Sequence, residues 1–251
     1  MSKMVQSIIV VGAGIVGSAI AMRLAQAGQK VQVIQGAAPN ATSAAFGWIN
    51  ASFFLNEDHH HLRAAGIAAW HRALNEVDAP VQWQGCLCWD MANDQMEATL
   101  TQLRDLQYPV ELLDRRQLYA RVPQVHALPD QALYFPTEGA ASSAEIAPHF
   151  LAAAQTFGAK VFSNLHVHRL LKRDEKIVGV ATNQGELHAD KVIIAAGTGS
   201  SALAESIGCE VPLLPRPAYI LRTNSLHPTL SHILATPDGE IRQEPNGQIL
   251  M

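Results

Sequence analysis

The 251-residue sequence has few charged residues, and neither sign dominates. Asp, Glu, Lys and Arg together make up 16% of it, and the formal net charge is −4. Lysine and arginine are scattered along the chain and form no basic run or stripe. A protein that binds a nucleic-acid backbone needs such a stripe to meet the phosphates. We therefore expect no nucleic-acid partner.

Cysteine and long apolar runs are also scarce. Cys86, Cys88 and Cys209 are an odd number, without the paired spacing of a zinc site or a disulfide framework. Reduced thiols are typical of a cytoplasmic protein, and that is the location we expect. No stretch reaches the roughly 18 uninterrupted apolar residues of a transmembrane helix, so no transmembrane segment is expected. The apolar start of the chain has the composition of a signal peptide, but the pattern that follows favours a folded unit.

Three glycines near the N-terminus stand between a strand-like and a helix-like segment. Residues 8–11 are all apolar and β-branched, as in a strand that is covered on both faces. Residues 15–27 carry apolar side chains at helical spacing and end just before Gly28, and residues 31–35 again have the pattern of a strand. Together these segments predict a β-loop-α-β unit within about 30 residues.

The glycines of this loop are Gly12, Gly14 and Gly17, and each suits the binding of a dinucleotide. The first permits the tight turn from strand to helix, the second lets the backbone approach a pyrophosphate, and the third lets helix and strand pack closely. The helix N-terminus adds unpaired N–H groups for the phosphates. Gln35 stands where a ribose-binding acid is expected, about 20 residues further on. Its amide offers one acceptor oxygen and no positive charge for a 2′-phosphate, so NADP is not favoured.

The remainder of the chain alternates helical and strand-like patterns. A helix is predicted over 56–77, with Leu62 on its buried face, and shorter helices over 96–106, 115–120 and 148–157. The stretch "VQWQGCLCWD" predicts a strand outside the nucleotide-binding unit. After the last of these helices, a strand-rich stretch predicts a small antiparallel sheet. The chain then returns to a buried strand that can lie beside the first one.

Several stretches together resemble one family. They are "VVGAGIVGSAIAMRLAQAG", "ATSAAFGWINASF", "LYFPTEGAASSAEI", "KVIIAAGTGSSALAESIG" and "IRQEPNGQILM", in this order along nearly the whole chain. The sequence is similar to the FAD-dependent amine and amino-acid oxidases, which include D-amino-acid oxidase, glycine oxidase and sarcosine oxidase. By this resemblance the cofactor is FAD, and its implied binding residues are Gly12, Gly14, Ile15, Val16, Gly17, Gln35, Thr42, Ser43, Ala44, Ala45, Gly47, Val167, Ala195, Ala196 and Gly197.

The resemblance also implies where parts of the cofactor would lie. The small residues from Thr42 to Gly47 would line the pyrophosphate and the flavin. Val167 would contact the adenine through its backbone, and Ala195–Gly197 would form a second turn against the dinucleotide. These assignments are expectations that the family suggests.

The implied fold is α/β with two interleaved domains. A discontinuous FAD-binding domain of the Rossmann type would take residues 1–78 and 140–210. A substrate domain built on an antiparallel or mixed sheet would take 79–139 and 211–251. The sequence departs from the family at Gln35, where Glu is usual, and it has no counterpart of the C-terminal segment that closes over the isoalloxazine. We therefore expect the chain to bind FAD weakly on its own.

The implied reaction is the oxidation of an amine or amino acid. A hydride would pass from the carbon next to nitrogen to FAD, giving an imine, and oxygen or an electron carrier would reoxidise the flavin. A second hypothesis is a non-catalytic or truncated dinucleotide-binding chain that needs a partner subunit or a missing segment. A third is an NAD-linked dehydrogenase, which only the glycine loop supports.

Arg242 is the candidate for holding a substrate carboxylate, because a guanidinium does so bidentately. The alternative is a surface arginine on an edge strand. His59–His61 are consecutive on a predicted helix, so their side chains point in different directions and a metal site is not expected. Cys86 and Cys88 face one side of a predicted strand, which favours buried apolar packing over a redox pair. No G-x-S-x-G motif supports a hydrolase.

Overall fold

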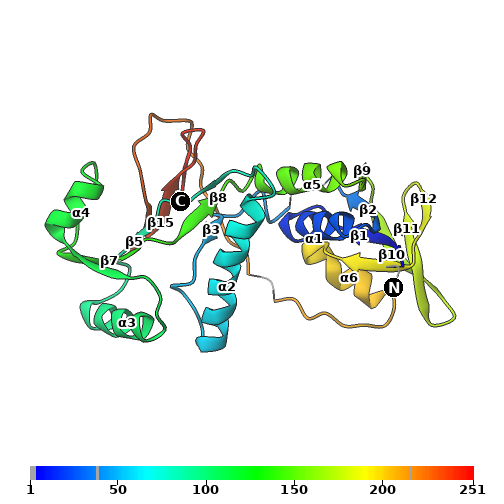
Figure 1. Cartoon of the computed structure of the whole chain (residues 1–251), viewed down its shortest axis with the longest axis horizontal. Helices are drawn as coiled ribbons and strands as arrows, with labels where there is room; N and C mark the ends of the chain where they lie inside the picture. The colour runs from blue at the N-terminus through cyan, green and yellow to red at the C-terminus, as the bar shows by residue number, and fades with distance from the viewer. Residues whose placement is uncertain (1–3, 38–39, 215) are drawn as a thin grey trace. The chain divides into compact units, whose positions relative to one another are not determined.

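The computed structural model describes residues 4–37, 40–214 and 216–251 of the chain. Contacts among these residues divide them into two units, each of which is discontinuous in sequence (Figure 1). The first unit comprises the described residues of Met1–Ala45, Val77–Ala79 and Ser143–Ala218, and the second comprises Phe46–Glu76, Pro80–Ser142 and Tyr219–Met251.

The first unit is built on a parallel sheet, whose strands are β1 (Ser7–Val11), β2 (Lys30–Gln35), β9 (Lys160–Ser163) and β13 (Lys191–Ile194). They lie in the order β13-β1-β2-β9, and each neighbouring pair is parallel. Residues Ile8–Val11 of β1 are all buried, which explains their apolar, β-branched sequence. Val11 pairs with Ile34 and Ile194, so three strands end side by side. The predicted β-loop-α-β unit and the return strand are confirmed.

Further helices and strands pack on this sheet. They are the helices α1 (Ile15–Gln26), α5 (Ile146–Thr156), η1 (Gly197–Gly199) and α6 (Ser200–Glu205), and the strands β10 (Val167–Arg173), β11 (Lys176–Thr182) and β12 (Gly185–His188). α1 packs against β1 and β2 and lies beside α5 (Figure 1). β10, β11 and β12 form the predicted antiparallel sheet. One apolar core joins Ile9, Val11 and Ile34 of the parallel sheet to Val180 of β11 and Leu203 of α6.

The second unit is built on a mixed sheet, in the order β16-β15-β14-β5-β7-β6. Only the β14–β5 pair is parallel among these described strands. A second small sheet has the order β3-β8-β4. The strands are β3 (Trp48–Ile49), β4 (Val81–Gln82), β5 (Cys86–Cys88), β6 (Glu111–Asp114), β7 (Gln131–Phe135), β8 (Gly139–Ala141), β14 (Ile233–Thr236), β15 (Gly239–Gln243) and β16 (Ile249–Leu250), and the helices are α2 (Glu57–Leu74), α3 (Asn93–Asp105) and α4 (Arg115–Arg121).

α2 departs from the sequence prediction in the side that it buries. Asn56 caps it as expected, since the Asn56 side chain accepts a hydrogen bond from His59 N–H. Leu62, however, was predicted to be buried and is 72% exposed. The side that packs inward carries His60, Ile67 and Ala73 instead.

The unit boundaries also differ from the expected domains. Residues 46–76, which include α2, were expected in the cofactor-binding domain, and by their contacts they belong to the second unit. The physical reason lies in contacts with residues 80–142, since the His71 ring stacks on Trp83 at 4.1 Å and Trp48 Nε1–H donates to Glu138 Oε2 at 3.0 Å. The assignment of a cofactor role to one unit and a substrate role to the other stays a prediction.

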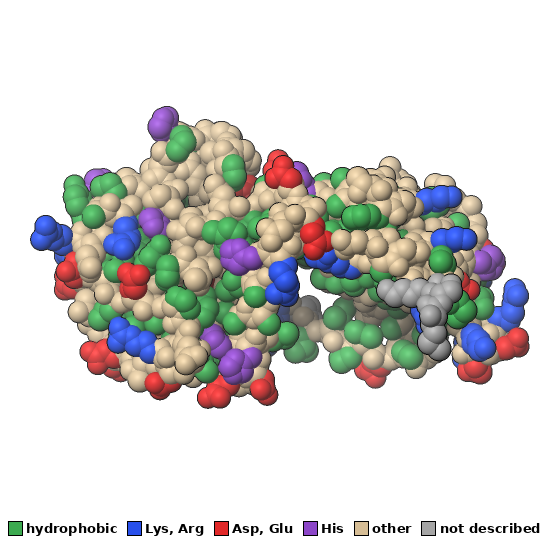
Figure 2. Space-filling model, in the orientation of Figure 1, with side chains coloured by type: hydrophobic (Ala, Val, Ile, Leu, Met, Phe, Trp, Pro, Cys, Tyr) green, Lys and Arg blue, Asp and Glu red, His purple; other side chains and the backbone are tan. Residues whose placement is uncertain are grey.

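None of the helices in the described part of the chain is long and apolar enough to cross a membrane. The charged side chains on the face shown in Figure 2 are interspersed in sign, in line with the sequence.

Candidate cofactor-binding site

The turn from β1 to α1 needs glycine at two positions. Gly12 has φ of +110°, a conformation that side-chain-bearing residues rarely adopt, and a Cβ there would lie 2.2 Å from Ala195 O. A Cβ on Gly17 would lie 2.0 Å from Gly12 O. Both contacts are with backbone atoms, which have little room to yield. The first and third glycines therefore allow β1, α1 and the turn after β13 to approach closely, as a dinucleotide-binding loop requires.

The N-terminus of α1 opens on this turn. Gly14 is its N-cap, in an extended conformation with φ of −68° and ψ of 179°. The N–H of Ile15 donates to Thr42 Oγ1 at 3.0 Å, so a hydroxyl from the segment after β2 caps the helix. No acidic residue stands in the first turn of α1 to compete with an anion. A hydroxyl that accepts from the helix can still donate its own proton to a ligand.

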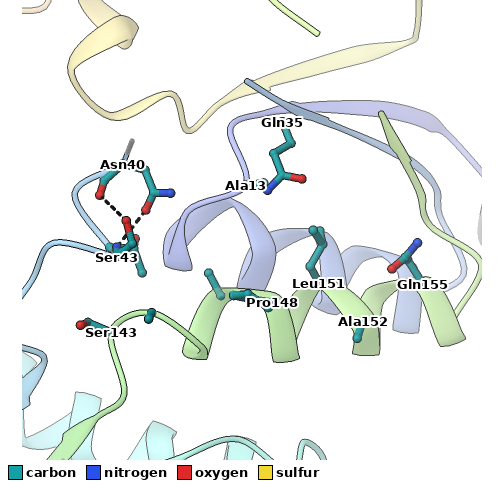
Figure 3. A pocket seen from close by; sticks show the side chains of 12 residues that line it. Ala13, Gln35, Asn40, Ser43, Ser143, Pro148, Leu151, Ala152 and Gln155 are labelled. Carbon is teal, nitrogen blue, oxygen red and sulfur yellow. Dashed lines mark hydrogen bonds between the residues drawn. The ribbon is translucent and has the colours of Figure 1, made fainter. Parts of the chain in front are cut away.

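A pocket of about 320 Å³ adjoins this helix end within the first unit (Figure 3). One wall is the β1–α1 turn, the end of β2 and the segment after it, and the opposite wall is α5 and the residues that lead into it. None of the described residues that line the pocket has a charged side chain. The lining residues are Ala13, Gln35, Asn40, Thr42, Ser43, Ser143, Ala144, Ala147, Pro148, Leu151, Ala152 and Gln155.

Gln35 is the last residue of β2 and extends into this pocket (Figure 3). Its Oε1 accepts a hydrogen bond from Ser163 Oγ at 3.1 Å, and its backbone oxygen accepts one from Leu165 N–H at 3.1 Å. The bond from Ser163 fixes the amide oxygen on the β9 side. The amide nitrogen, which can only donate, is then the group available to a ligand.

The structure brings some of the predicted cofactor residues together and separates others. Gln35, Thr42 and Ser43 share the pocket, and Ser43 is held by Asn40, whose Oδ1 accepts from Ser43 N–H at 3.0 Å (Figure 3). Ile15 meets the pocket only through its bond to Thr42, and Val16 on the first turn of α1 is 62% exposed. The glycines Gly12, Gly14 and Gly17 form the turn beside the pocket and do not line it. The other predicted residues that do not line it are Ala44, Ala45, Gly47, Val167, Ala195, Ala196 and Gly197.

Three of these residues outside the pocket show where the others lie: Ala195, Val167 and Gly47 are in different parts of the chain, while Ala44 and Ala45 directly follow Ser43. Ala195 follows β13, and its N–H donates to Val11 O at 2.8 Å, which sets Ala195 against Gly12. Val167 begins β10 and is buried. Gly47 lies in the second unit, where a Cβ would be 2.4 Å from Ala141 O. Their contacts with a cofactor stay predictions.

The residues that form the α5 wall of the pocket were not predicted from the sequence. Ser143, Leu151 and Gln155 were not singled out, although the helix itself was predicted over 148–157 and is observed two residues earlier at its start. Its apolar face predicts packing, and α5 does pack on α1. Nothing in the local pattern separates the residues that touch α1 from those that border the pocket.

Arg242 lies in the interior of the second unit, and the alternative of a surface arginine on an edge strand is wrong. Its strand, β15, runs between β14 and β16, and the side chain is fully buried. Nε donates to Phe46 O at 2.6 Å, and Nη2 donates to Ala141 O at 3.2 Å and to Glu244 Oε1 at 2.9 Å. Burial lowers the pKa of Arg242, while Glu244 acts in the opposite direction. A role for Arg242 in binding a substrate carboxylate stays a prediction.

The next residues to consider are the histidine run and the two cysteines of β5, whose side chains are engaged in packing and hydrogen bonds of the fold. His60 is buried with Nδ1 2.9 Å from Ala51 O, whereas His59 Nδ1 accepts from Leu55 N–H at 3.2 Å. In the described part of the chain, no three His, Cys, Asp or Glu side chains are arranged as metal ligands. Cys86 and Cys88 are both buried, as predicted, and burial raises the pKa of each thiol. Thiols that stay protonated are poor redox nucleophiles.

Comparison with known proteins places these features in a family. The family described as DAO, FAD dependent oxidoreductase, matches residues 7–251. The chain belongs to this family. It is 30% identical over 225 residues to glycine oxidase of Pseudomonas aeruginosa, covering 84% of this chain and 61% of that protein. The chain is also 36% identical over 102 residues to sarcosine oxidase subunit beta of an Arthrobacter species, covering 39% of this chain and 25% of that protein.

Solved structures give the same fold. The crystal structure of glycine oxidase from Geobacillus kaustophilus superposes with a TM-score of 0.82 at 21% identity, covering 99% of this chain and 70% of that one. At this identity the likeness speaks for the fold alone, and the expected α/β fold of FAD-dependent oxidases is confirmed. The chain spans about 61% of the length of the Pseudomonas glycine oxidase.

The residues present fit the adenosine diphosphate part of FAD. A Cβ at position 12 or 17 would collide with backbone oxygens, so these two glycines keep the turn at the helix end tight and free of side chains. Thr42 brings a hydroxyl to the same place. Gln35 supplies an amide at the place of the ribose-binding acid. The site is therefore compatible with the cofactor of the family.

Proposed function

We propose that the first unit binds FAD and that the protein, in its active form, oxidises an amine or amino acid. The β1–α1 turn carries this proposal. Only glycine fits at Gly12 and Gly17, the turn leads into the N-terminus of α1, and an uncharged pocket of about 320 Å³ adjoins it. When bound, FAD supplies the hydride acceptor for the oxidation of a carbon next to nitrogen.

The chain's own residues would bind and orient this cofactor. The N–H groups at the start of α1 offset the charge of the pyrophosphate, and Thr42 donates its hydroxyl to a phosphate oxygen while it accepts from Ile15 N–H. Gln35 donates its amide to the ribose. Ser43, Ala44, Ala45 and Gly47 line the pyrophosphate and flavin, Val167 contacts the adenine, and Ala195, Ala196 and Gly197 close on the dinucleotide.

Arg242 is the proposed holder of the substrate carboxylate in the second unit. Nη1 is buried and has no hydrogen-bond partner among the described residues, whereas Nε and Nη2 are bonded to Phe46, Ala141 and Glu244. One edge of the guanidinium is therefore committed to the fold, and the other remains for a ligand. Oxygen or an electron carrier is the proposed final acceptor.

A partner subunit is the second proposal. The sarcosine oxidase relative is named as a subunit, and the match covers about 25% of it. A chain that is similar to part of such a subunit can depend on another polypeptide for part of its site. An NAD-linked dehydrogenase receives no support beyond the glycine loop. Cytoplasmic location is proposed on the free thiols Cys86, Cys88 and Cys209.

Reconstitution tests the proposed function directly. The purified chain is incubated with excess FAD and desalted, and its visible spectrum and its production of peroxide with glycine, sarcosine and D-alanine are measured. Retained flavin and an amine-dependent loss of its absorbance support the proposal. A chain that retains no flavin, with or without a co-expressed neighbour, contradicts it.

A further inference from the structure

Asn40 directly precedes the turn of residues 41–44 and lines the pocket beside the N-terminus of α1. Its Oδ1 accepts a hydrogen bond from Ser43 N–H at 3.0 Å, and Ser43 Oγ donates to Asn40 O at 3.0 Å. A backbone N–H can only donate, so the bond from Ser43 decides which way the amide of Asn40 faces. The amide oxygen belongs to the turn, and the amide nitrogen is left for the pocket.

Gln35 has the same arrangement at the end of β2. Its Oε1 is held by Ser163 Oγ at 3.1 Å, which leaves its amide nitrogen on the pocket side. In Figure 3 the amide nitrogen of Asn40 points toward the side of Gln35, and that of Gln35 points back toward the side of Asn40. Among the described residues, neither nitrogen has a hydrogen-bond partner. Each amide therefore keeps its N–H donors for a ligand.

The position of this pair matches the ribose end of an adenosine diphosphate rather than its phosphates. Gln35 ends β2, which is the place of the ribose-binding residue in a β-loop-α-β unit. The pyrophosphate is expected at the N-terminus of α1, where Ile15 N–H donates to Thr42 Oγ1 at 3.0 Å. Asn40 shares the pocket with Gln35, whereas Ile15 does not line it.

Two amides recognise a ribose by the opposite hydrogen-bonding scheme to a carboxylate. A carboxylate accepts the protons of the two hydroxyls, whereas amide nitrogens donate to the hydroxyl oxygens. Each hydroxyl oxygen has two lone pairs, so it accepts such a bond and still donates its own proton to water. The described residues that line the pocket are uncharged, so none of them offers an ion that would compete for the amides. Two neutral donors can thus take the place of a single acid.

We propose that Asn40 is a second ribose-binding residue and that it forms a donor pair with Gln35. Each amide nitrogen donates to one hydroxyl oxygen of the adenosine ribose. The inference rests on the proposed function, because it takes the first unit as the site of the adenosine diphosphate. It assigns a ligand contact to a residue outside the glycine loop and outside the set that the family resemblance implies. All the residues that carry it belong to the first unit.

Two substitutions of Asn40 separate ligand binding from its role in the turn. Asn40→Ala removes both the amide nitrogen and the acceptor of Ser43 N–H, whereas Asn40→Ser keeps an acceptor for that N–H and removes only the donor. In calorimetric titrations of the apo-chain with ADP, we expect both variants to bind about three- to tenfold more weakly than the wild type. Wild-type affinity in Asn40→Ser would mean that the side chain serves the turn alone, and it would overturn the proposal.

Deoxy ligands identify the contact itself. The titrations are repeated with 2′-deoxy-ADP and 3′-deoxy-ADP, each of which lacks one ribose hydroxyl. For one of these ligands, Asn40→Ser should change the affinity by less than about twofold, since the oxygen that Asn40 meets is already absent. Gln35→Ala should lose its effect with the other ligand. An effect of Asn40→Ser that has the same size for ADP and for both deoxy ligands would overturn the proposal.

Asn183→Ala is the matched control within the first unit. Asn183 Oδ1 also accepts from a backbone N–H, that of His166, at 2.9 Å, but Asn183 does not line the pocket. Its substitution should leave the affinity for ADP unchanged, and a weakening like that of Asn40→Ser would count against the proposed contact.

The wild-type titrations test the proposed function separately. A wild-type chain that binds neither ADP nor FAD contradicts both the proposed function and the donor pair. Binding of ADP by the wild type with no effect of Asn40→Ser contradicts the donor pair alone.

Discussion

Replacing Gln35 with glutamate is expected to tighten the binding of FAD and ADP to the first unit. Gln35 Oε1 already accepts from Ser163 Oγ at 3.1 Å, so in the proposed complex the amide nitrogen is the group that faces the ribose. The amide nitrogen can only donate to a ribose hydroxyl and cannot accept the hydroxyl's own proton. A glutamate keeps the acceptor for Ser163 and adds a second, charged acceptor on the pocket side.

The size of the effect follows from one gained hydrogen bond to a charged group. Such a bond contributes about 1 to 2 kcal/mol, which is up to about thirtyfold in Kd. The described residues that line the pocket carry no charge, so among them the new carboxylate meets no cation and no other acid. Its repulsion from the pyrophosphate is the opposing effect, and it limits the gain.

Calorimetric titration of the apo-chain with ADP and with FAD measures the change. Gln155→Glu is the matched control, because it places the same charge on α5, on the opposite wall of the same pocket. It should weaken ADP slightly or leave it unchanged. Equal or weaker affinity of the Gln35→Glu variant, or the same gain in both variants, would refute the proposed contact between Gln35 and the ribose.

Three further predictions follow from the contacts. Gly17→Ala should lower the free energy of unfolding, measured in urea, by about 1 to 3 kcal/mol and weaken the binding of ADP, because the new Cβ would lie 2.0 Å from Gly12 O. The control Gly66→Ala, whose Cβ would have no atom within 4 Å, should do neither. Arg242→Lys should cost about 2 kcal/mol of stability through the lost bonds to Phe46 O and Ala141 O; if Arg242 also holds substrate, KM should rise for amino acids and not for simple amines, and an equal rise for both would reject that role. Because burial raises the pKa of Glu138 above its ordinary 4.5, the folded state holds the proton of this carboxyl more tightly than the unfolded state does. The free energy of unfolding should therefore fall as the pH rises from 4.5 through the raised pKa of Glu138. The same pH dependence in the Glu138→Gln variant would contradict its assignment to Glu138.

The sequence predicts the first unit well because its signals are local. The glycines Gly12 and Gly17 have backbone neighbours that exclude any Cβ, and the apolar run of β1 is buried on both faces. Such constraints act within about 30 residues and leave a readable pattern. The placement of β13 beside β1 follows from the same reasoning, since a buried parallel strand is apolar throughout.

The second unit is harder to predict because contacts between residues far apart in the sequence decide which of its side chains are buried. Leu62 has helical spacing with apolar neighbours, yet the partners of α2 lie on the side of His60 and Ile67. Arg242 is buried because Phe46 and Ala141, far away in sequence, offer their carbonyl oxygens. Glu138 has no local signal at all, since its donors come from two segments far from it in the sequence, residues 48–52 and Tyr108.

Parallel titration of the apo-chain with FAD, NAD and NADP tests the central claim most directly. The β1–α1 turn, Thr42 and the uncharged pocket at Gln35 fit an adenosine diphosphate group, and the chain belongs to the FAD-dependent oxidoreductase family. The account predicts that FAD binds more tightly than NAD or NADP and that ADP competes with it at the same site. Tighter binding of NADP than of FAD would contradict the account.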